Sequence, residues 1–287
     1  MVASMAPVPA LDSLSNSLAS PEQLFAFKQV DDEKSQSLRF ALYQIISAAG
    51  ILLRLPQEII AQAIVLLQRL EVVGHPQPAY DVREHCATCT FLAAKPSPTP
   101  ISWRSLANVY AYLTSHASPL KFINPDGPPT DLHPEEYYVT EGTLQGDINH
   151  MVTAEGELLQ SIGFDTRVVL PHGLALTYLQ ALGVSSATLA RRVLEHLNAG
   201  LLSPQMLYLT HQPNALAVGA IYLAARELGV KLVEQNWWEV FDVDREDLGF
   251  LVMAFGSISN FAGAELEKWK MTGLRPIKPF ARAPIRP

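Results

Sequence analysis

Apolar residues recur along most of the chain with the 3.6-residue period of amphipathic helices. A first stripe over residues 38–53 predicts one helix, and Pro56 both ends it and begins a second. A third helix is predicted from Asp81 to Lys95, because Asp81 begins a capping-box pattern. Ser102 is expected to cap a short fourth helix, since serine side chains accept hydrogen bonds from the first backbone N–H groups of a helix.

The middle of the chain interrupts this pattern. Prolines recur between Ser115 and Thr143, so this stretch is expected to be an irregular loop. A fifth helix is predicted over about 147–162, where apolar residues return in helical register. Gly163 follows directly and is expected to end that helix, because glycine adopts the left-handed conformation at little cost.

The second half repeats the count of five helices. The predicted helices cover 171–182, a stretch that begins at Ser185 or Ser186 and runs through Asn198, 213–228, a short segment at Trp237-Trp238 and a last one that begins near Asp244. No segment alternates with the period of two that a half-buried strand requires, so the protein is predicted to be all-α. Two successive sets of five helices, each with a third helix rich in small residues, indicate a duplicated domain.

Composition and charge narrow the possible functions. Of the 287 residues 48% are hydrophobic and 17% are charged, which excludes disorder for most of the chain. The formal net charge is −7, but from Ala264 to the end six basic and two acidic residues give +4, so the rest carries −11. This acidic body disfavours direct nucleic-acid binding, which requires clustered basic residues to neutralise phosphates. The proline-containing tail is expected to be extended beyond about residue 272.

Targeting signals are not evident. The first twenty residues contain no Lys or Arg and no long apolar run, so no targeting peptide is expected. The longest wholly apolar or small runs fall well short of the roughly 20 residues that span a bilayer. Two cysteines in a chain of this length suit a reducing compartment. We therefore expect an intracellular protein with no membrane-spanning segment.

Several segments together resemble the cyclin family. The third predicted helices end in Leu-Ala-Ala-Lys (92–95) and Leu-Ala-Ala-Arg (223–226), and their small residues allow other helices to approach closely. The clearest match is AAGILLRLPQ (48–57) followed by VLLQR (65–69), which is very similar to cyclin L; weaker ordered matches extend over roughly residues 20–262. A match of this length is more specific than a single motif.

The resemblance implies an all-α fold of tandem five-helix cyclin boxes with irregular N- and C-terminal extensions. The implied limits are 1–37 for the N-terminal extension, 38–167 for the first box, 168–263 for the second box and 264–287 for the basic tail. It also implies a non-catalytic role without cofactor or metal: the activating subunit of a cyclin-dependent kinase in a nuclear heterodimer. Cyclin L-type members act in transcription and pre-mRNA processing, with a PITSLRE-type kinase as the implied partner and another transcriptional kinase as the alternative.

The kinase-binding residues implied by the resemblance lie in the first box. The lysine that ends the third helix of a cyclin box corresponds to Lys95, and the glutamate near the start of the fifth corresponds to Glu155. Leu92, Leu159 and Phe164 are the apolar neighbours expected to join them. The family pattern continues with a hydrophobic residue and two acids after the lysine, whereas here Pro-Ser-Pro follows. Without the resemblance, Lys95 and Glu155 would be interpreted as ordinary solvated charges.

Alternative interpretations stay open from the sequence. A tandem cyclin fold also serves transcription factors of the TFIIB type and adaptors that bind nucleic acid or proteins without a kinase. The Cys86-Ala-Thr-Cys89 pair is typical of zinc or redox sites, but its place inside a small-residue helix favours simple packing. Trp237 and Trp238 either fill the gap between helices or offer a surface for a base or a peptide.

Overall fold

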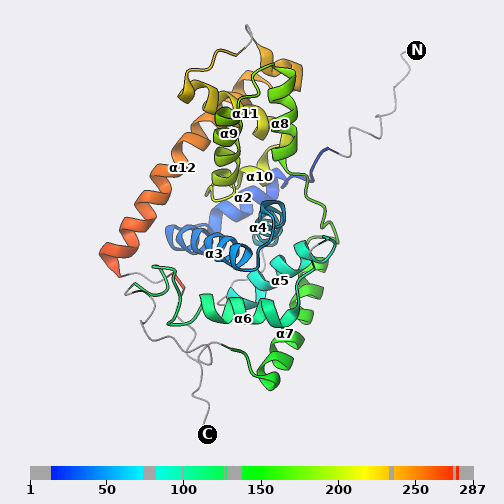
Figure 1. The fold of residues 1–287 in the computed structure, drawn as a ribbon, viewed down its shortest axis with the longest axis vertical. Helices are drawn as coiled ribbons and strands as arrows, with labels where there is room; N and C mark the ends of the chain where they lie inside the picture. Colours follow the sequence, from blue (N-terminus) through cyan, green and yellow to red (C-terminus); the bar gives the residue numbers. More distant parts are fainter. Residues whose placement is uncertain are drawn as a thin grey trace, which may run out of the picture. The chain divides into compact units, whose positions relative to one another are not determined.

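The computed structural model describes residues 14–73, 82–98, 100–125, 127, 138–232, 236–273 and 276–277. Among these residues all regular structure is helical and none is strand (Figure 1), so the predicted all-α class is confirmed. The elements in chain order are α2 (Pro21–Val30), α3 (Glu33–Leu52), α4 (Gln57–Val72), α5 (Val82–Ala94), α6 (Trp103–Leu113), α7 (Glu141–Ser161), α8 (Pro171–Ala181), α9 (Ala187–Gly200), α10 (Leu207–Thr210), α11 (Pro213–Leu228), the 3₁₀ helix η2 (Trp237–Phe241) and α12 (Arg245–Thr272).

The contacts divide the chain into two compact units. The first unit comprises residues 21–166 and 259–287, and the second comprises residues 1–20 and 167–258. Each unit therefore combines a continuous central stretch with a segment from one end of the chain. Helix α12 contributes its first half to the second unit and its second half to the first.

In the first unit α5 packs against α3, α4, α6 and α7. Its small buried residues, among them Cys86, Cys89 and Ala94, allow four helices to approach it. Gly50 on α3 shows how tight the neighbouring packing is, because a Cβ atom there would lie 2.3 Å from Cγ1 of Ile60 on α4. This glycine belongs to the AAGILLRLPQ segment, and the close approach of Ile60 explains why the position holds a residue without a side chain.

The helix boundaries in the first unit mostly follow the sequence patterns. Ser102 caps α6 by accepting a hydrogen bond from the backbone N–H of Ser105, as predicted. Helix α7 begins at Glu141, well before the expected start, because the Thr140 side chain accepts from the N–H of Thr143 and caps it. The expected cap Asp81 lies outside the described residues. Helix α2 was not predicted from any apolar stripe, and none of its side chains is fully buried.

In the second unit α11 packs against α8, α9, α10 and η2. It ends at Gly229, whose φ of +65° is the left-handed conformation that its position predicts. A Cβ atom at Gly219 would lie 2.9 Å from the Cβ of Leu251, so α11 and the first half of α12 are also in close contact. Of the two serines that the sequence offered as the start of α9, Ser186 is the cap, and its side chain accepts from the N–H of Leu189.

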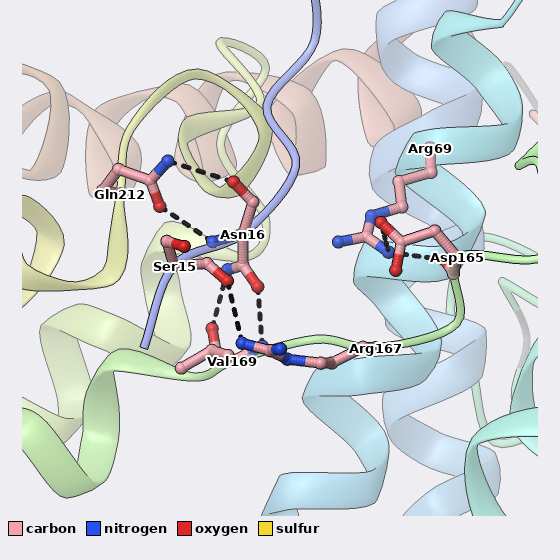
Figure 2. A network of polar contacts seen from close by, with 7 residues as sticks. All are labelled: Ser15, Asn16, Arg69, Asp165, Arg167, Val169 and Gln212. Atoms are coloured by element: carbon pink, nitrogen blue, oxygen red, sulfur yellow. Dashed lines mark hydrogen bonds and ion pairs between the residues drawn. The ribbon is translucent and has the colours of Figure 1, made fainter. Parts of the chain in front are cut away.

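A short N-terminal segment is part of the second unit. The side chain of Asn16 pairs with the backbone of Val169, donating to its carbonyl at 2.8 Å and accepting from its N–H at 2.7 Å (Figure 2). The side chain of Gln212 pairs in the same way with the backbone of Asn16, at 3.0 and 2.9 Å. Two amide side chains thus fix an extended segment to residues more than 150 positions away in the sequence.

Helix α12 is the one helix in the described part of the chain that is long and apolar enough to cross a membrane. A core helix of a soluble protein meets the same criterion, and both halves of α12 have core contacts. Leu251 and Phe255 are buried in the second unit. In the first unit the indole N–H of Trp269 donates to the hydroxyl of Ser37 at 2.7 Å, and its ring packs near Phe122.

Candidate functional site

The structure brings Lys95 and Glu155 together in the first unit. The Lys95 ammonium lies 2.8 Å from a Glu155 carboxylate oxygen and 5.7 Å from the centre of the Phe91 ring. The Lys95 side chain is 56% exposed and that of Glu155 only 12%. An ion pair with one exposed partner stabilises a fold by about 1 kcal/mol at most. Its main effect is to hold one ammonium group at a fixed place on the surface, where α5 and α7 meet.

Of the apolar neighbours, Leu92 and Leu159 lie closer to the core than to the surface. Leu92 is 8% exposed, so most of its side chain packs inside the first unit. Leu159 is half-buried on α7. Leu92 therefore packs beneath the surface that carries Lys95 and Glu155. Leu159 exposes only part of its side chain there.

Phe164 is the exposed apolar residue of this site. Its side chain is 68% exposed, and its backbone φ is +60°, directly after Gly163 at +62°. The Phe164 N–H donates to the carbonyl of Leu159 at 2.7 Å, which closes the end of α7 in the way that Gly163 predicted. A left-handed backbone costs a residue with a side chain about 1–2 kcal/mol. The fold thus presents an aromatic ring to solvent at a cost in free energy, a combination that is typical of functional positions.

Arg69 fixes the turn that carries Phe164, and the sequence pattern did not single it out. Its guanidinium donates to the backbone carbonyl of Asp165 at 2.7 Å and lies 3.7 Å from the Asp165 carboxylate (Figure 2). Partial burial lowers the pKa of Arg69, although the nearby Asp165 carboxylate opposes this shift. Arg69 is the last residue of the VLLQR segment, which contributed to the cyclin resemblance. Only the structure shows that this arginine binds Asp165 in the turn after α7.

A buried polar cluster lies in the core of the first unit and was also missed. The Tyr43 hydroxyl donates to the Glu71 carboxylate at 2.7 Å, and Arg39 pairs with Asp31 at 2.7 Å. Burial raises the pKa of Glu71 to about 7, although the nearby Arg39 charge and the Tyr43 hydrogen bond oppose the shift. Burial likewise raises the pKa of Tyr43, which stays protonated as the donor. Nothing in the helical periodicity distinguishes these residues from surface polar ones.

The two cysteines are part of the core. Both Cys86 and Cys89 are buried and neither forms a disulfide, and burial raises the pKa of Cys89 well above its usual value. A thiol with a raised pKa is neither a good nucleophile nor a ready metal ligand. Among the described residues no group of three His, Cys, Asp or Glu side chains could hold a metal ion. The packing interpretation thus accounts for both residues.

Two solved structures contain a chain with a similar arrangement of helices. A chain of the yeast RNA polymerase II CTD kinase CTDK-1 complex matches with a TM-score of 0.67 at 14% identity, over 94% of this chain and 87% of that one. A chain of the CAK complex of Chaetomium thermophilum matches with a TM-score of 0.55 at 15% identity, over 94% and 84%. At such low identity these likenesses establish the fold alone.

Sequence comparisons carry the family assignment. No protein-family model matches the chain. An uncharacterized cyclin-L1-like protein of Schizosaccharomyces pombe is 32% identical over 241 residues, which cover 84% of this chain and 88% of that protein. Cyclin-L2 of Mus musculus is 30% identical over 226 residues, and cyclin-L1 of Homo sapiens 27% over 246. The fold and these relatives define the class: the chain belongs to the cyclin family.

Within that family the similarity is to cyclin L, as the sequence predicted. The matched regions cover 76% and 82% of this chain but only 40% and 43% of the mouse and human proteins. The chain thus spans about two fifths of the length of these mammalian relatives. The similarity therefore concerns only part of each of these longer proteins.

Proposed function

We propose that this cyclin is the non-catalytic, activating subunit of a cyclin-dependent kinase and binds it as a heterodimer through the first cyclin box. The observation that carries the proposal is that the first unit exposes both Lys95, held by Glu155 of α7, and the ring of Phe164, which lies just after the end of α7. Leu159 and Leu92 lie between the exposed residues and the core. A fixed cation and an exposed aromatic ring are both features that suit a protein interface.

The backbone at Phe164 supports this role. An aromatic ring held in solvent by a strained turn adds nothing to the fold, and the strain lowers the stability of the isolated protein. Burial of the ring by a partner would return free energy, because covering a phenylalanine side chain contributes about 1.5–3 kcal/mol. Arg69 keeps the turn in place before the partner arrives, which reduces the ordering cost of binding.

The proposed mechanism is a population shift in the kinase. A protein kinase is active when the glutamate of its αC helix pairs with the lysine of strand β3. A subunit that binds only the conformation with αC turned inward raises the population of that conformation without taking part in phosphoryl transfer. The cyclin needs only a rigid surface for this, and α5 and α7 supply one.

The relatives support a proposal for the type of kinase and for the cellular process in which it acts. The similarity to cyclin L supports a PITSLRE-type partner in transcription and pre-mRNA processing within the nucleus. The solved structure with the higher TM-score is that of an RNA polymerase II CTD kinase complex, which supports a kinase of transcription more generally. We place the first cyclin box at residues 38–167 and the second at 168–263, with extensions at both ends.

The test is a charge swap at the ion pair. The double variant Lys95→Glu with Glu155→Lys keeps an ion pair within the cyclin but reverses the charge that the kinase meets. We expect retention of a co-expressed PITSLRE-type kinase to fall about thirtyfold or more, since interfacial charge pairs contribute about 2 kcal/mol or more when desolvated. Helical content and melting temperature should stay within error of the unmodified chain.

The matched control is Arg226→Glu, at the corresponding end of the third helix of the second half. This variant makes a charge change of the same kind and should leave kinase retention unchanged. Equal retention by the Lys95 and Glu155 double variant would contradict the proposed interface. Salt-sensitive binding of duplex DNA at physiological ionic strength would instead favour the TFIIB-type alternative.

A further inference from the structure

A pocket of about 600 Å³ opens on the second unit between α11, η2 and the first turns of α12. Arg226 of α11 and Arg245 of α12 line it together with Tyr222 and Trp238. The exposed side chain of Met253 forms part of its apolar edge. No acidic residue is among the described residues that line the pocket, although the chain as a whole carries a net charge of −7.

The two arginines have no ion-pair partner among the described residues. Arg192 in the same unit shows the usual alternative, because its guanidinium pairs with Glu227 at 2.6 Å and with Glu195 at 3.0 Å. Glu227 directly follows Arg226 in the sequence, yet its carboxylate is engaged by Arg192 and His196. Arg226 and Arg245 thus leave two guanidinium groups available at one pocket.

Trp238 adds a third donor. Its indole nitrogen is buried and finds no hydrogen-bond acceptor in the part of the chain that the structure describes. The ring is held edge to face between Tyr222, at 6.4 Å between centroids, and Trp237, at 6.2 Å. A buried N–H without an acceptor is costly in a folded protein, so an acceptor that enters the pocket and reaches this group would stabilise the protein. Trp237 itself is buried and fills the gap between helices.

A second pocket of the same unit shows that the basic character is local. That pocket, of about 740 Å³, is lined by Asp242 and Asp247 and, among the described residues, by no Lys or Arg. The charged residues that line the two pockets are therefore of opposite sign, and the arginines at the smaller one do not reflect a generally basic surface. A nucleic-acid tract would need a longer series of basic residues than two.

We propose that the smaller pocket binds the phosphate monoester of a phosphorylated peptide. Guanidinium groups match phosphate oxygens in a bidentate manner, and the indole N–H of Trp238 would supply a further donor. The apolar edge at Met253 and Val252 suits an apolar residue beside the phosphorylated one. This function goes beyond the proposed kinase regulation and does not depend on it, since none of the pocket residues belongs to the surface around Lys95 and Phe164.

The experiment uses the full chain and five synthetic probes in isothermal titration calorimetry. Two short peptides with an apolar residue beside the modified position carry phosphoserine or phosphotyrosine, two more are the same peptides with unmodified serine or tyrosine, and the fifth probe is inorganic phosphate. We expect one or both phosphopeptides to bind at least tenfold more tightly than the unphosphorylated form and than phosphate. Their relative affinity shows which of the two side chains the pocket takes.

Substitutions locate the binding. Arg226→Ala and Arg245→Ala should each weaken phosphopeptide binding about tenfold or more, because hydrogen bonds to charged groups are the strong ones. Trp238→Phe keeps an aromatic ring without the N–H donor and should weaken binding about fivefold. Arg191→Ala, at an exposed arginine of α9 in the same unit, is the matched control and should change nothing.

Three outcomes would overturn the proposal: no phosphopeptide binding at millimolar concentration, equal binding of the unphosphorylated peptide, or binding that persists unchanged in the double variant of Arg226 and Arg245. Tighter binding of a single-stranded RNA oligonucleotide that is lost in the same variants would overturn it in favour of nucleic acid. The arginine variants should retain the kinase fully, so failure here and failure of the proposed kinase interface are separate results.

Discussion

Helices α5 and α11 have corresponding places in the two units, but their ends are used differently. Near its C-terminal end each helix carries Leu-Ala-Ala followed by a basic residue, which is Lys95 directly after α5 and Arg226 in the last turn of α11. Lys95 is held by Glu155 from α7 at 2.8 Å. Arg226 has no such partner among the described residues and lines a pocket with Arg245. The same sequence signal thus leads to a neutralised cation in one unit and to an available one in the other.

The cores around α5 and α11 also differ in the kind of side chain that they bury. In the first unit polar groups are buried and paired, as in the Tyr43–Glu71 bond and the bond at 2.7 Å between the hydroxyls of Thr90 and Tyr110. In the second unit α11 buries small apolar residues such as Ala217 and Ala224. Buried polar pairs restrict a core to one arrangement, whereas small residues allow the closest approach of helices. The comparison indicates that the stability of the first unit depends on the ionisation of Glu71 in addition to close packing, whereas the packing of small residues dominates around α11.

The largest effect is expected from Glu71→Gln. The folded first unit holds the Glu71 proton up to a pKa of about 7, against an ordinary value of 4.5. The folded state therefore binds more protons than the unfolded state between these values, and its stability falls as pH rises through this window. Glutamine cannot ionise but still accepts from Tyr43. From pH 4.5 to 7.5 the unmodified chain should lose about 3 kcal/mol of unfolding free energy relative to the variant.

Urea unfolding followed by circular dichroism at several pH values measures this difference. The neighbouring groups Arg39 and Tyr43 are the same in both proteins, so Glu71 is the ionisable group that differs between them. A stability difference that does not change with pH would show that the pKa of Glu71 is the same in the folded and unfolded states, and the contrast between the two cores would then lose its basis.

A smaller effect is expected from Gly219→Ala in the second unit. The new methyl group would meet the Cβ of Leu251 at 2.9 Å, and overpacking of this kind costs about 1–3 kcal/mol. That cost exceeds the gain of about 1 kcal/mol that alanine brings to a helix. Gly256→Ala on α12 has open space around it and is the control, with an expected gain in stability. A stabilising Gly219→Ala would mean that α11 and α12 can separate freely.

The smallest effect on stability is expected from Phe164→Gly. Glycine removes the strain of a left-handed backbone but adds freedom to the unfolded chain, so the unfolding free energy should rise by about 1 kcal/mol or less. Kinase retention should fall at the same time, because the exposed ring is lost. Phe164→Ala keeps the strain and loses the ring, and it should reduce retention equally. A marked loss of stability in Phe164→Gly would assign the ring to the core instead.

The sequence predicted the helices well where their ends carry a chemical signal. Ser102, Ser186, Gly163 and Gly229 act as the caps and stops that their side chains or their lack of one dictate. It was less accurate where such a signal is weak: α2 has no buried stripe, and the start of α7 was placed too late because Thr140 lies inside a proline-containing stretch. The expectation of two tandem cyclin boxes with terminal extensions came from the cyclin resemblance.

The sequence by itself determined the all-α class and the repeated helical pattern, because periodicity, capping and composition are local properties. The two candidate charges at Lys95 and Glu155 came from the resemblance of the sequence to cyclins. Only the tertiary structure decided that these charges meet across 60 residues, that Arg69 holds the turn of Phe164, and that Arg226 and Arg245 share a pocket. Such contacts depend on which helix faces are brought together. Two helix ends with nearly the same sequence can therefore acquire different roles, since each is defined by residues distant along the chain.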